Sequence, residues 1–469
     1  MRLIDDLRAV VGEAQVLTGA ATAGHARDWM GKYRGAPVAV VRPASTAEVA
    51  ACVRVAAAHG AAVVPIGGNT GLVGGTMTDG GVMVSLERMN RIRAVRRDAR
   101  LVVAEAGVVL SRLHDAAAAE GLYFPLWFGA RGSAMLGGAL ATNAGGSNVL
   151  RYGSTRALCL GLEVVLADGR VLDLMGELHK DNSGYDLRDL FIGSEGTLGI
   201  ITAAVMKLVP APLAQATATV ALRSVADALV LLHRMQAATG GRVEAFEFMP
   251  RTYCERLQAV RPDLGLPFAA IAEVTILVEA ATTVPAEAVA DAGGLIPLVG
   301  QLERELAALL EAGLIEDAVI ARSEAQRRAM WARREAAAEL CVGLEPAVDT
   351  DLCLPLDRVE PFLTEALRRL EAMDPGLRSL TVGHLGDGNL HFTLLPTRGD
   401  AALKDRVLEV VEDVVVAMGG SFSAEHGVGL SKLPSMARRK DKVALEVMRA
   451  VKAALDPEAR MNPGKVIPR

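Results

Sequence analysis

The sequence predicts a fold of the α+β class with more than one domain. Short β-prone runs alternate with helical patterns and glycine-rich turns up to about residue 210, and strands mixed with longer helices continue to about residue 420. The chain has 469 residues, which is too many for one simple core, since domains usually hold about 100–200 residues. The segment Val209-Pro210-Ala211-Pro212 contains two prolines, which interrupt regular secondary structure, and it predicts a domain boundary there.

Composition excludes several classes of protein. Basic residues number 50 and acidic residues 55, so the net charge of −5 leaves no basic excess for binding nucleic acid. The five cysteines are dispersed and form no C-x-x-C pair, which argues against an iron–sulfur cluster and fits a reducing compartment. The N-terminus lacks the apolar core of a signal peptide, and no segment is apolar enough to span a membrane. We therefore expect a soluble cytoplasmic protein.

The first region is expected to mix strands with a capped helix. Ser45 and Gly60 delimit the helix Thr46–His59, because serine caps helix N-termini and glycine follows C-termini. The segment Ala167-Asp168-Gly169-Arg170 reads as a hairpin turn. The expected strands, all short and rich in Val, Leu and Ile, are Val38–Val41, Ala62–Ile66, Val82–Leu86, Leu101–Ala104, Leu162–Leu166 and Ile200–Lys207.

The second region is expected to be α+β again, and a terminal helix at Lys442–Leu455 follows it. Helical patterns cover Val225–Thr239, Ile296–Ala312 and Ser323–Val342, and β-prone runs cover Thr217–Leu222, Ala269–Val278 and Ser379–Val382.

Three glycine-rich loops stand out in the first region. They are Pro65–Gly75, Gly129–Gly146 and Gly193–Gly199. Because glycine lacks a Cβ atom, backbone N–H groups in such loops can approach an anion closely. For one loop alone a structural turn remains an alternative, and none matches G-x-G-x-x-G or a P-loop. Three together indicate an extended ligand that carries a pyrophosphate.

Histidines and a carboxylate gather in two motifs of the second half. In H-L-G-D-G-N-L-H, a four-residue hairpin loop at 386–389 would place His384 opposite His391, within reach of one metal ion. In S-A-E-H-G-V-G, Glu425 could supply a third ligand and His426 a base. Hairpin histidines bonded to carbonyls or water, and a surface Glu-His pair, remain the alternatives. Arg334 could hold a substrate carboxylate or simply lie on a solvated helix face.

Together these segments resemble the FAD-dependent D-2-hydroxy acid dehydrogenases, on the vanillyl-alcohol-oxidase-type fold. The resemblance runs from Pro37 to Pro468 and is most similar to the D-2-hydroxyglutarate and D-lactate enzymes. Its motifs are P-I-G-G-N-T-G-L-V-G-G, A-T-N-A-G-G, R-Y-G-S, G-L-E-V-V-L-A-D-G, K-D-N-S-G-Y-D-L-R-D-L-F-I-G-S-E-G-T-L-G-I-I-T, H-L-G-D-G-N-L-H, S-A-E-H-G-V-G and N-P-G-K. It implies a two-lobed FAD-binding domain at 1–210, a substrate (cap) domain at 211–420 and a C-terminal segment at 421–469 that returns to the FAD domain and active site.

The resemblance assigns roles to individual residues. It implies metal ligands at His384, His391 and Glu425, usually for zinc, with His426 as catalytic base and Arg334 on the substrate carboxylate. Asn69 stands where covalent members of the wider fold carry a flavin-linking histidine, so we expect dissociable FAD. The implied FAD contacts are Pro65, Gly67, Gly68, Asn69, Thr70, Gly71, Gly132, Ser133, Gly137, Asn143, Gly145, Gly146, Arg151, Gly153, Glu195, Gly196, Gly199, Ile200 and Asn462.

Three positions depart from the pattern of the hydroxyglutarate enzymes. Asp349 replaces a lysine, Ala338 a threonine and Thr393 an asparagine. An acidic residue in place of a cation disfavours a second substrate carboxylate. The expected substrate is therefore D-2-hydroxyglutarate, D-lactate or a similar D-2-hydroxy acid, with Asp349 and Thr393 near its far end.

The implied reaction yields the 2-oxo acid and passes hydride to flavin N5. Electrons would leave to an external acceptor such as electron-transfer flavoprotein or a quinone-linked carrier, and the resemblance leaves a homodimer open. The alternatives are a flavin-dependent oxidase of another alcohol, a zinc hydrolase built on His384, His391 and Glu425, and a non-catalytic binding protein. A zinc hydrolase would leave the three glycine-rich loops without a function. A non-catalytic binding protein would leave the adjacent Glu425 and His426 without one.

Overall fold

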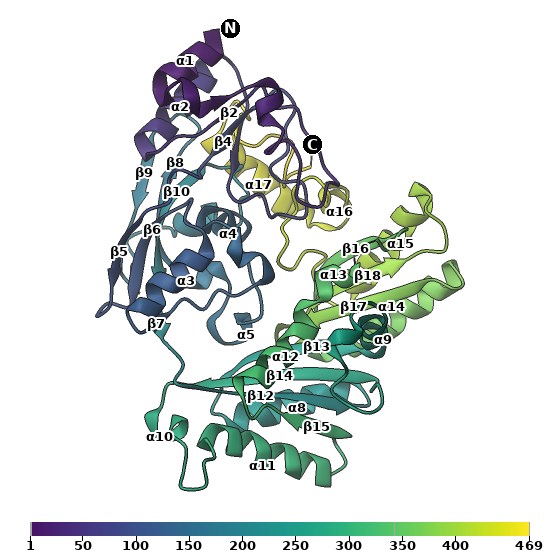
Figure 1. The fold of residues 1–469 in the computed structure, drawn as a ribbon. Helices are drawn as coiled ribbons and strands as arrows, with labels where there is room; N and C mark the ends of the chain where they lie inside the picture. The colour runs from purple at the N-terminus through teal and green to yellow at the C-terminus, as the bar shows by residue number, and fades with distance from the viewer. Residues whose placement is uncertain (1, 342, 469) are drawn as a thin grey trace. The chain divides into compact units, whose positions relative to one another are not determined.

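The computed structural model describes residues 2–341 and 343–468, and the chain forms two compact units (Figure 1). Unit 1 comprises Met1–Gly145, Gly153–Ala211 and Glu425–Arg469, and unit 2 comprises Gly146–Tyr152 and Pro212–Ala424. Each unit therefore contains segments that are far apart in the sequence. No helix in the described part of the chain combines the length and apolar character that a bilayer crossing requires.

The first sheet of unit 1 carries the first glycine-rich loop. Its four strands lie in the order β1 (Val16–Leu17), β2 (Ala39–Val41), β4 (Val82–Ser85) and β3 (Val63–Ile66), and the last three are parallel. Helix α2 (Thr46–Ala58) begins at a reciprocal cap, because Ser45 Oγ accepts from Glu48 N while Glu48 Oε2 accepts from Ala44 N. The sequence prediction of this cap is confirmed.

The second sheet of unit 1 is antiparallel and has five strands. They lie in the order β5 (Ile92–Arg96), β6 (Leu101–Glu105), β10 (Ile200–Lys207), β8 (Cys159–Val165) and β9 (Val171–Leu174). The predicted turn at 167–170 joins β8 to β9, with Gly169 at φ +79°. The other elements of unit 1 are α1 (Arg2–Val11), α3 (Leu110–Ala119), β7 (Leu122–Tyr123), α4 (Leu136–Thr142), α6 (Thr155–Leu158), α7 (Arg188–Phe191), β11 (Val209–Pro210), α16 (Leu433–Arg439) and α17 (Lys442–Leu455).

Unit 2 is built on one seven-stranded sheet. In sheet order its strands are β15 (Asp317–Ile320), β12 (Ala214–Leu222), β14 (Val274–Thr282), β13 (Val243–Pro250), β17 (Arg378–His384), β18 (Asn389–Leu395) and β16 (Val348–Cys353). The helices are α5 (Val149–Tyr152), α8 (Val225–Ala238), α9 (Arg251–Val260), α10 (Pro285–Ala288), α11 (Pro297–Glu311), α12 (Glu324–Glu335), α13 (Ala337–Cys341), α14 (Val359–Met373) and α15 (Ala401–Ala417).

The two faces of this sheet differ in chemistry. Ile276 and Val278 point into a large apolar core with side chains of α8, α11, α14 and α15. Leu277, between them, points to the opposite face and packs with residues of α9, α12 and α13 in a smaller core. This second face also carries the polar side chains described below.

Two sequence predictions of elements are wrong. The expected helix Ser323–Val342 is broken at Ala336 into α12 and α13, and its expected last residue lies outside the described residues. The expected strand Ala269–Val278 begins at Val274, because the neighbouring strands end opposite that residue at Leu222 and Pro250 and leave earlier residues without pairing partners. The other expected elements are present with ends shifted by a few residues, and Ile200–Lys207 and Lys442–Leu455 match.

Candidate active site

The glycine-rich loops of unit 1 lie against one another. A Cβ atom on Gly68 would collide with the carbonyl oxygen of Ser133, so the first loop touches the second. Gly196, at φ +74°, lies against the ring of Pro65, so the third loop touches the first. Because these contacts leave no room for a side chain, glycine at 68 and 196 is required by packing.

Other glycines in the same loops face open space. A Cβ atom on Gly71, Gly132 or Gly138 would meet no atom within 4 Å, and none of the three has a positive φ. Neither packing nor conformation therefore requires glycine there. Glycines that border open space leave the backbone accessible, as expected where an extended ligand approaches it closely.

Two asparagines expected to contact FAD shape the loops. Asn69 and Asn143 both adopt the left-handed conformation, with φ of 52° and 50°. Asn69 Nδ2 donates to the carbonyl of Arg27 at 2.8 Å. Asn143 Oδ1 accepts from Ser154 Oγ and from Arg156 N, both at 2.9 Å. These contacts give both side chains a structural role that the sequence did not reveal.

Glu195 and Asn462 connect the third glycine loop to the C-terminal segment. The buried carboxylate of Glu195 accepts from Val428 N at 2.7 Å and from Gly429 N at 2.9 Å, and burial raises its pKa. Asn462 Nδ2 donates to the carbonyl oxygens of Gly75 and Glu195 at 2.9 and 2.7 Å. Among the described residues, the buried Oδ1 of Asn462 has no hydrogen-bond partner, as expected of an atom that faces a ligand.

The remaining residues of the expected FAD set are in different surroundings. Gly137 and Gly199 are required by close packing, against Ala106 and against Val164 of β8. Gly146 and Arg151 belong to unit 2, where Arg151 Nη1 pairs with Glu244 at 2.9 Å and donates to a backbone carbonyl. The structure therefore assigns Arg151 a buried carboxylate partner within unit 2. Gly67, Thr70, Gly145, Gly153 and Ile200 all lie in unit 1.

His384 and His391 lie on one face of the unit 2 sheet, but not in the predicted register. His384 pairs with Asn389 and Val382 pairs with His391, so the expected pairing of His384 with His391 and of Leu385 with Leu390 is wrong. The loop is 385–388 because a short turn at Leu385–Asp387 ends at Gly388 in the left-handed conformation. The two imidazoles are diagonal neighbours instead, with ring centroids 5.6 Å apart.

Each histidine has a carboxylate beside it on a neighbouring strand. His384 Nδ1 lies 2.9 Å from Glu247 Oε1, and His391 Nδ1 lies 3.9 Å from Asp351 Oδ1. Burial by itself would raise the pKa of Glu247, but His384 and Arg334 hold it below its usual value. Asp351 Oδ2 accepts from Ala424 N at 3.1 Å and so fixes the residue directly before Glu425. Sequence reasoning missed both carboxylates, although each is a buried acidic residue within a strand.

Arg334 is buried beneath the same sheet face and reaches Glu247. Its Nε lies 2.7 Å from Glu247 Oε2. Among the described residues its buried Nη2 has no hydrogen-bond partner, so this nitrogen can still bind an anion. The alternative of a solvated helix face is therefore wrong, because Arg334 has only 8% of its surface exposed.

The two expected selectivity residues form a pair. Asp349 of β16 and Thr393 of β18 are directly opposed, and Thr393 Oγ1 donates to Asp349 Oδ1 at 3.0 Å. They lie two pairs along from Asp351 and His391 and therefore on the same sheet face. The last expected residues, Glu425 and His426, open the C-terminal segment of unit 1, with His426 Nε2 3.8 Å from Glu425 Oε1.

Comparison with known proteins identifies the family to which the chain belongs. The model of the FAD binding domain matches residues 37–175, and that of the C-terminal domain of FAD linked oxidases matches residues 211–466. Mitochondrial D-2-hydroxyglutarate dehydrogenase of Bos taurus is 37% identical over 94% of this chain and 79% of its own length. The D-2-hydroxyglutarate dehydrogenase of Stutzerimonas stutzeri is 35% identical over 99% of this chain and 98% of its own.

Solved structures of low identity share the fold. p-Cresol methylhydroxylase aligns over 99% of this chain and 96% of its own, with a TM-score of 0.75 and 16% identity. Alkyldihydroxyacetonephosphate synthase aligns over 99% of this chain and 86% of its own, with a TM-score of 0.73 and 18% identity. With matched domains over most of its length and relatives above 30% identity, the chain belongs to the family of FAD-dependent D-2-hydroxy acid dehydrogenases, on the vanillyl-alcohol-oxidase-type fold.

Proposed function

We propose that this enzyme oxidises a D-2-hydroxy acid to the 2-oxo acid with the help of a divalent metal ion and passes the electrons to an external acceptor. One observation carries the proposal. His384 and His391, each beside a carboxylate, share a sheet face with Arg334, whose Nη2 is buried without a hydrogen-bond partner among the described residues. Metal ligands and a carboxylate anchor together are what a 2-hydroxy acid requires.

The histidines suit a metal ion. A carboxylate at Nδ1 of His384 favours the tautomer whose Nε2 carries the lone pair, which is the usual orientation of a metal-ligating histidine. Glu425, directly after Ala424, is the proposed third protein ligand. Two imidazoles and one carboxylate with an open position favour zinc among divalent ions.

FAD suits the loops of unit 1. The open faces of Gly71, Gly132 and Gly138 and the buried Oδ1 of Asn462 are the proposed contacts. The side chain of Asn69 makes its hydrogen bonds within the protein, so we propose dissociable rather than covalent FAD. When bound, the flavin supplies a hydride acceptor at N5, and the metal ion lowers the pKa of the substrate hydroxyl.

Side chains of this protein would bind the substrate and accept its proton. Arg334 binds the substrate carboxylate and thereby fixes which face of C2 is presented. His426 accepts the hydroxyl proton as C2 loses hydride. Electron-transfer flavoprotein or a quinone-linked carrier is the proposed acceptor, because the five dispersed cysteines cannot hold a relay cluster.

Two substrate classes are supported by different observations. The relatives named D-2-hydroxyglutarate dehydrogenases support a dicarboxylate. The acidic Asp349, two residues from Asp351 on the same face of β16, favours an acid with an uncharged far end, such as D-lactate.

The test is anaerobic mixing of the metal-loaded holoenzyme with D- and L-2-hydroxy acids while the flavin band near ~450 nm is followed. Bleaching by a D-acid that is lost with a chelator is expected, and the fastest acid identifies the substrate. No bleaching by any 2-hydroxy acid would contradict the proposal and favour another alcohol. In a His426→Ala variant FAD should remain bound while reduction is abolished, and near-normal reduction would contradict the role of His426 as base.

A further inference from the structure

We propose that Glu247 is a positioning residue that joins the metal-binding half of the site to its carboxylate-binding half. The inference rests on the proposed function, because it assigns His384 to the metal and Arg334 to the substrate. Glu247 itself touches neither ligand in this scheme. It acts through the two side chains that do.

The geometry places Glu247 between its two partners. Glu247 of β13 is directly opposite His384 of β17 in the backbone register. Its side chain is fully buried. Oε1 lies 2.9 Å from His384 Nδ1, and Oε2 lies 2.7 Å from Arg334 Nε. Each oxygen of one carboxylate is thus used by a different half of the site.

The backbone of Arg334 has its own support. Tyr253 of α9 donates its hydroxyl to the carbonyl of Arg333 at 2.7 Å and to that of Arg334 at 3.2 Å, at the C-terminal end of α12. The helix end is therefore held without Glu247. Replacing Glu247 should release the guanidinium and the imidazole without moving the backbone that carries them.

A carboxylate in this position does two things at once. At Nδ1 of His384 it fixes the tautomer and ring orientation, so that Nε2 is presented for ligation. At Nε of Arg334 it holds the planar guanidinium by an ion pair, and Nη2, which has no hydrogen-bond partner among the described residues, stays available for a carboxylate. Metal affinity and carboxylate affinity should therefore fall together when Glu247 is changed.

Glu279 offers a matched control on the same sheet face. Its buried carboxylate pairs through both oxygens with Arg327 of α12 at 2.7 Å and accepts from Trp331 Nε1 at 2.9 Å. It therefore ties the same helix to the neighbouring strand β14. Its hydrogen bonds join it to Thr217, Arg327 and Trp331, so Glu279→Gln removes a comparable buried charge outside the proposed site.

The experiment measures binding and not turnover. Zn²⁺ affinity is determined by competition with a chromophoric chelator on the FAD-loaded enzyme, and carboxylate affinity by titrating oxalate against the flavin absorption band. In Glu247→Gln we expect zinc to bind about 10–100-fold more weakly, the range usual for loss of a carboxylate behind a ligating histidine. Oxalate should also bind more weakly to this variant. In Glu279→Gln both affinities should match those of the wild type.

Several results would overturn the inference. Wild-type zinc affinity in Glu247→Gln would do so, as would weaker zinc binding with unchanged oxalate binding, because the two halves would then not be joined. If Glu247→Gln does not fold, Glu247→Asp is judged by the same criteria, since its shorter side chain cannot reach both partners. A wild-type enzyme that bleaches with a D-acid but binds no zinc would overturn the metal site and this inference together while leaving the reaction intact.

Discussion

The carboxylate of Glu195 accepts hydrogen bonds from the backbone N–H of Val428 at 2.7 Å and of its neighbour Gly429 at 2.9 Å. The residue adopts φ +51° at the tip of the third glycine loop, and Gly427 packs so closely that a Cβ atom would lie 2.8 Å from Glu195 Oε1. One glutamate therefore holds the segment that directly follows Glu425 and His426. Its function is to position that segment within unit 1.

Replacing Glu195 by alanine should release this segment. The buried N–H of Gly429 and the partly buried N–H of Val428 would lose their acceptor, and a buried group left unsatisfied costs about 1–3 kcal/mol. Flavin reduction by the substrate should slow by at least about tenfold, because misplacement of a proton acceptor by a fraction of an ångström is costly. Stopped-flow reduction and chemical denaturation measure the two effects.

The control for Glu195 lies elsewhere in unit 1. Asp441 accepts from Ala444 N at the start of α17, so Asp441→Ala also removes a carboxylate-to-backbone bond. It should lower stability by about 0.5–2 kcal/mol without slowing flavin reduction. Equal slowing in both variants would show that Glu195 contributes only to stability.

Arg334 should not tolerate lysine. A lysine keeps the charge but loses the planar fork that can serve Glu247 and a substrate carboxylate at the same time. We expect Arg334→Lys to lower kcat/KM by about a hundredfold, equivalent to about 2.7 kcal/mol, with KM carrying part of the loss. Arg334→Ala should also destabilise the fold by about 3–5 kcal/mol, because the buried Glu247 loses a cation.

The matched substitution is Arg328→Lys on the same helix. Arg328 has a side chain that is 73% exposed and an ion pair with Glu324, so the change should leave KM and kcat unaltered. Steady-state kinetics with the identified D-acid compare the two variants. An Arg334→Lys enzyme with wild-type KM would contradict the assigned role.

Asp349 should influence the choice between mono- and dicarboxylates. Changing Asp349→Lys replaces an anion by a cation beside Thr393, so the preference for D-2-hydroxyglutarate over D-lactate should rise by at least about tenfold, or about 1.4 kcal/mol. Asp349→Asn removes only the negative charge and should give a smaller rise. The ratio of the two kcat/KM values measures the effect, and a ratio that does not change in either variant would separate Asp349 from substrate choice.

The sequence predicts the local structure of this protein better than it predicts contacts between residues that are far apart in the chain. Ile200–Lys207 and Lys442–Leu455 have the predicted bounds because periodicity and caps are local properties. The register of the histidine hairpin differs from the predicted one by two residues, with His384 opposite Asn389 and not His391. The cause is that the left-handed Gly388 ends a short helical turn, a choice of turn type that the motif does not specify. The sequence does not reveal Glu247 as a neighbour of His384, because 137 positions separate the two residues. Only strand order in the sheet brings the two together.

The glycines illustrate the same limit. The loops were predicted as a ligand site, but Gly68 and Gly196 are needed for packing between loops, whereas Gly71 and Gly132 face open space. In the sequence, the glycines required by packing and those that face open space cannot be told apart. Only the position of the neighbouring backbone distinguishes them.

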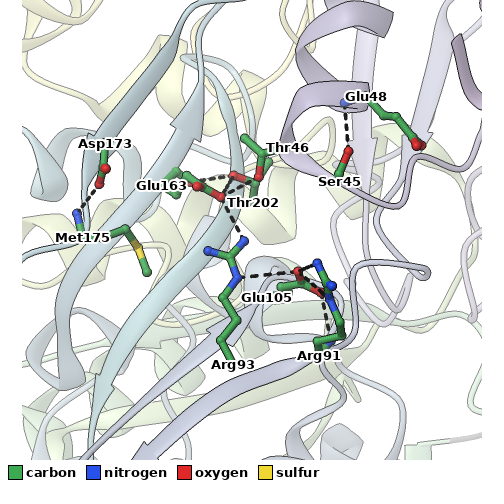
Figure 2. Close-up of polar contacts among 10 residues, drawn as sticks. All are labelled: Ser45, Thr46, Glu48, Arg91, Arg93, Glu105, Glu163, Asp173, Met175 and Thr202. Atoms are coloured by element: carbon green, nitrogen blue, oxygen red, sulfur yellow. Dashed lines mark hydrogen bonds and ion pairs between the residues drawn. The ribbon is translucent and has the colours of Figure 1, made fainter.

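A cluster of charged residues around the buried Glu105, in the second sheet of unit 1, predicts how stability depends on pH. Figure 2 shows Arg93 between the carboxylates of Glu105 and Glu163, at 3.5 and 3.3 Å, with Arg91 on the other side of Glu105. The Glu105 side chain is fully buried and accepts from Arg91 N at 3.0 Å and from Arg91 Nη2 at 2.8 Å. Burial would raise the pKa of Glu105, but its bonds to Arg91 and the charge of Arg93 hold it below its usual value.

The sign of the pH effect follows from this lowered pKa. A carboxyl whose pKa is lower in the folded than in the unfolded chain stabilises the fold above its unfolded pKa of about 4.3, and the stabilisation is lost as pH falls through the folded pKa. Glu105→Gln should therefore reduce stability at pH ~7 by about 1–2 kcal/mol, towards the lower end because Arg91 is 71% exposed and screened by salt. Its melting temperature should then fall less steeply than that of the wild type between pH ~5 and ~3. Glu177→Gln, which removes a surface partner of Arg96, should leave the wild-type acid profile unchanged, and a Glu105→Gln profile parallel to that of the wild type would show that the cluster does not contribute to acid sensitivity.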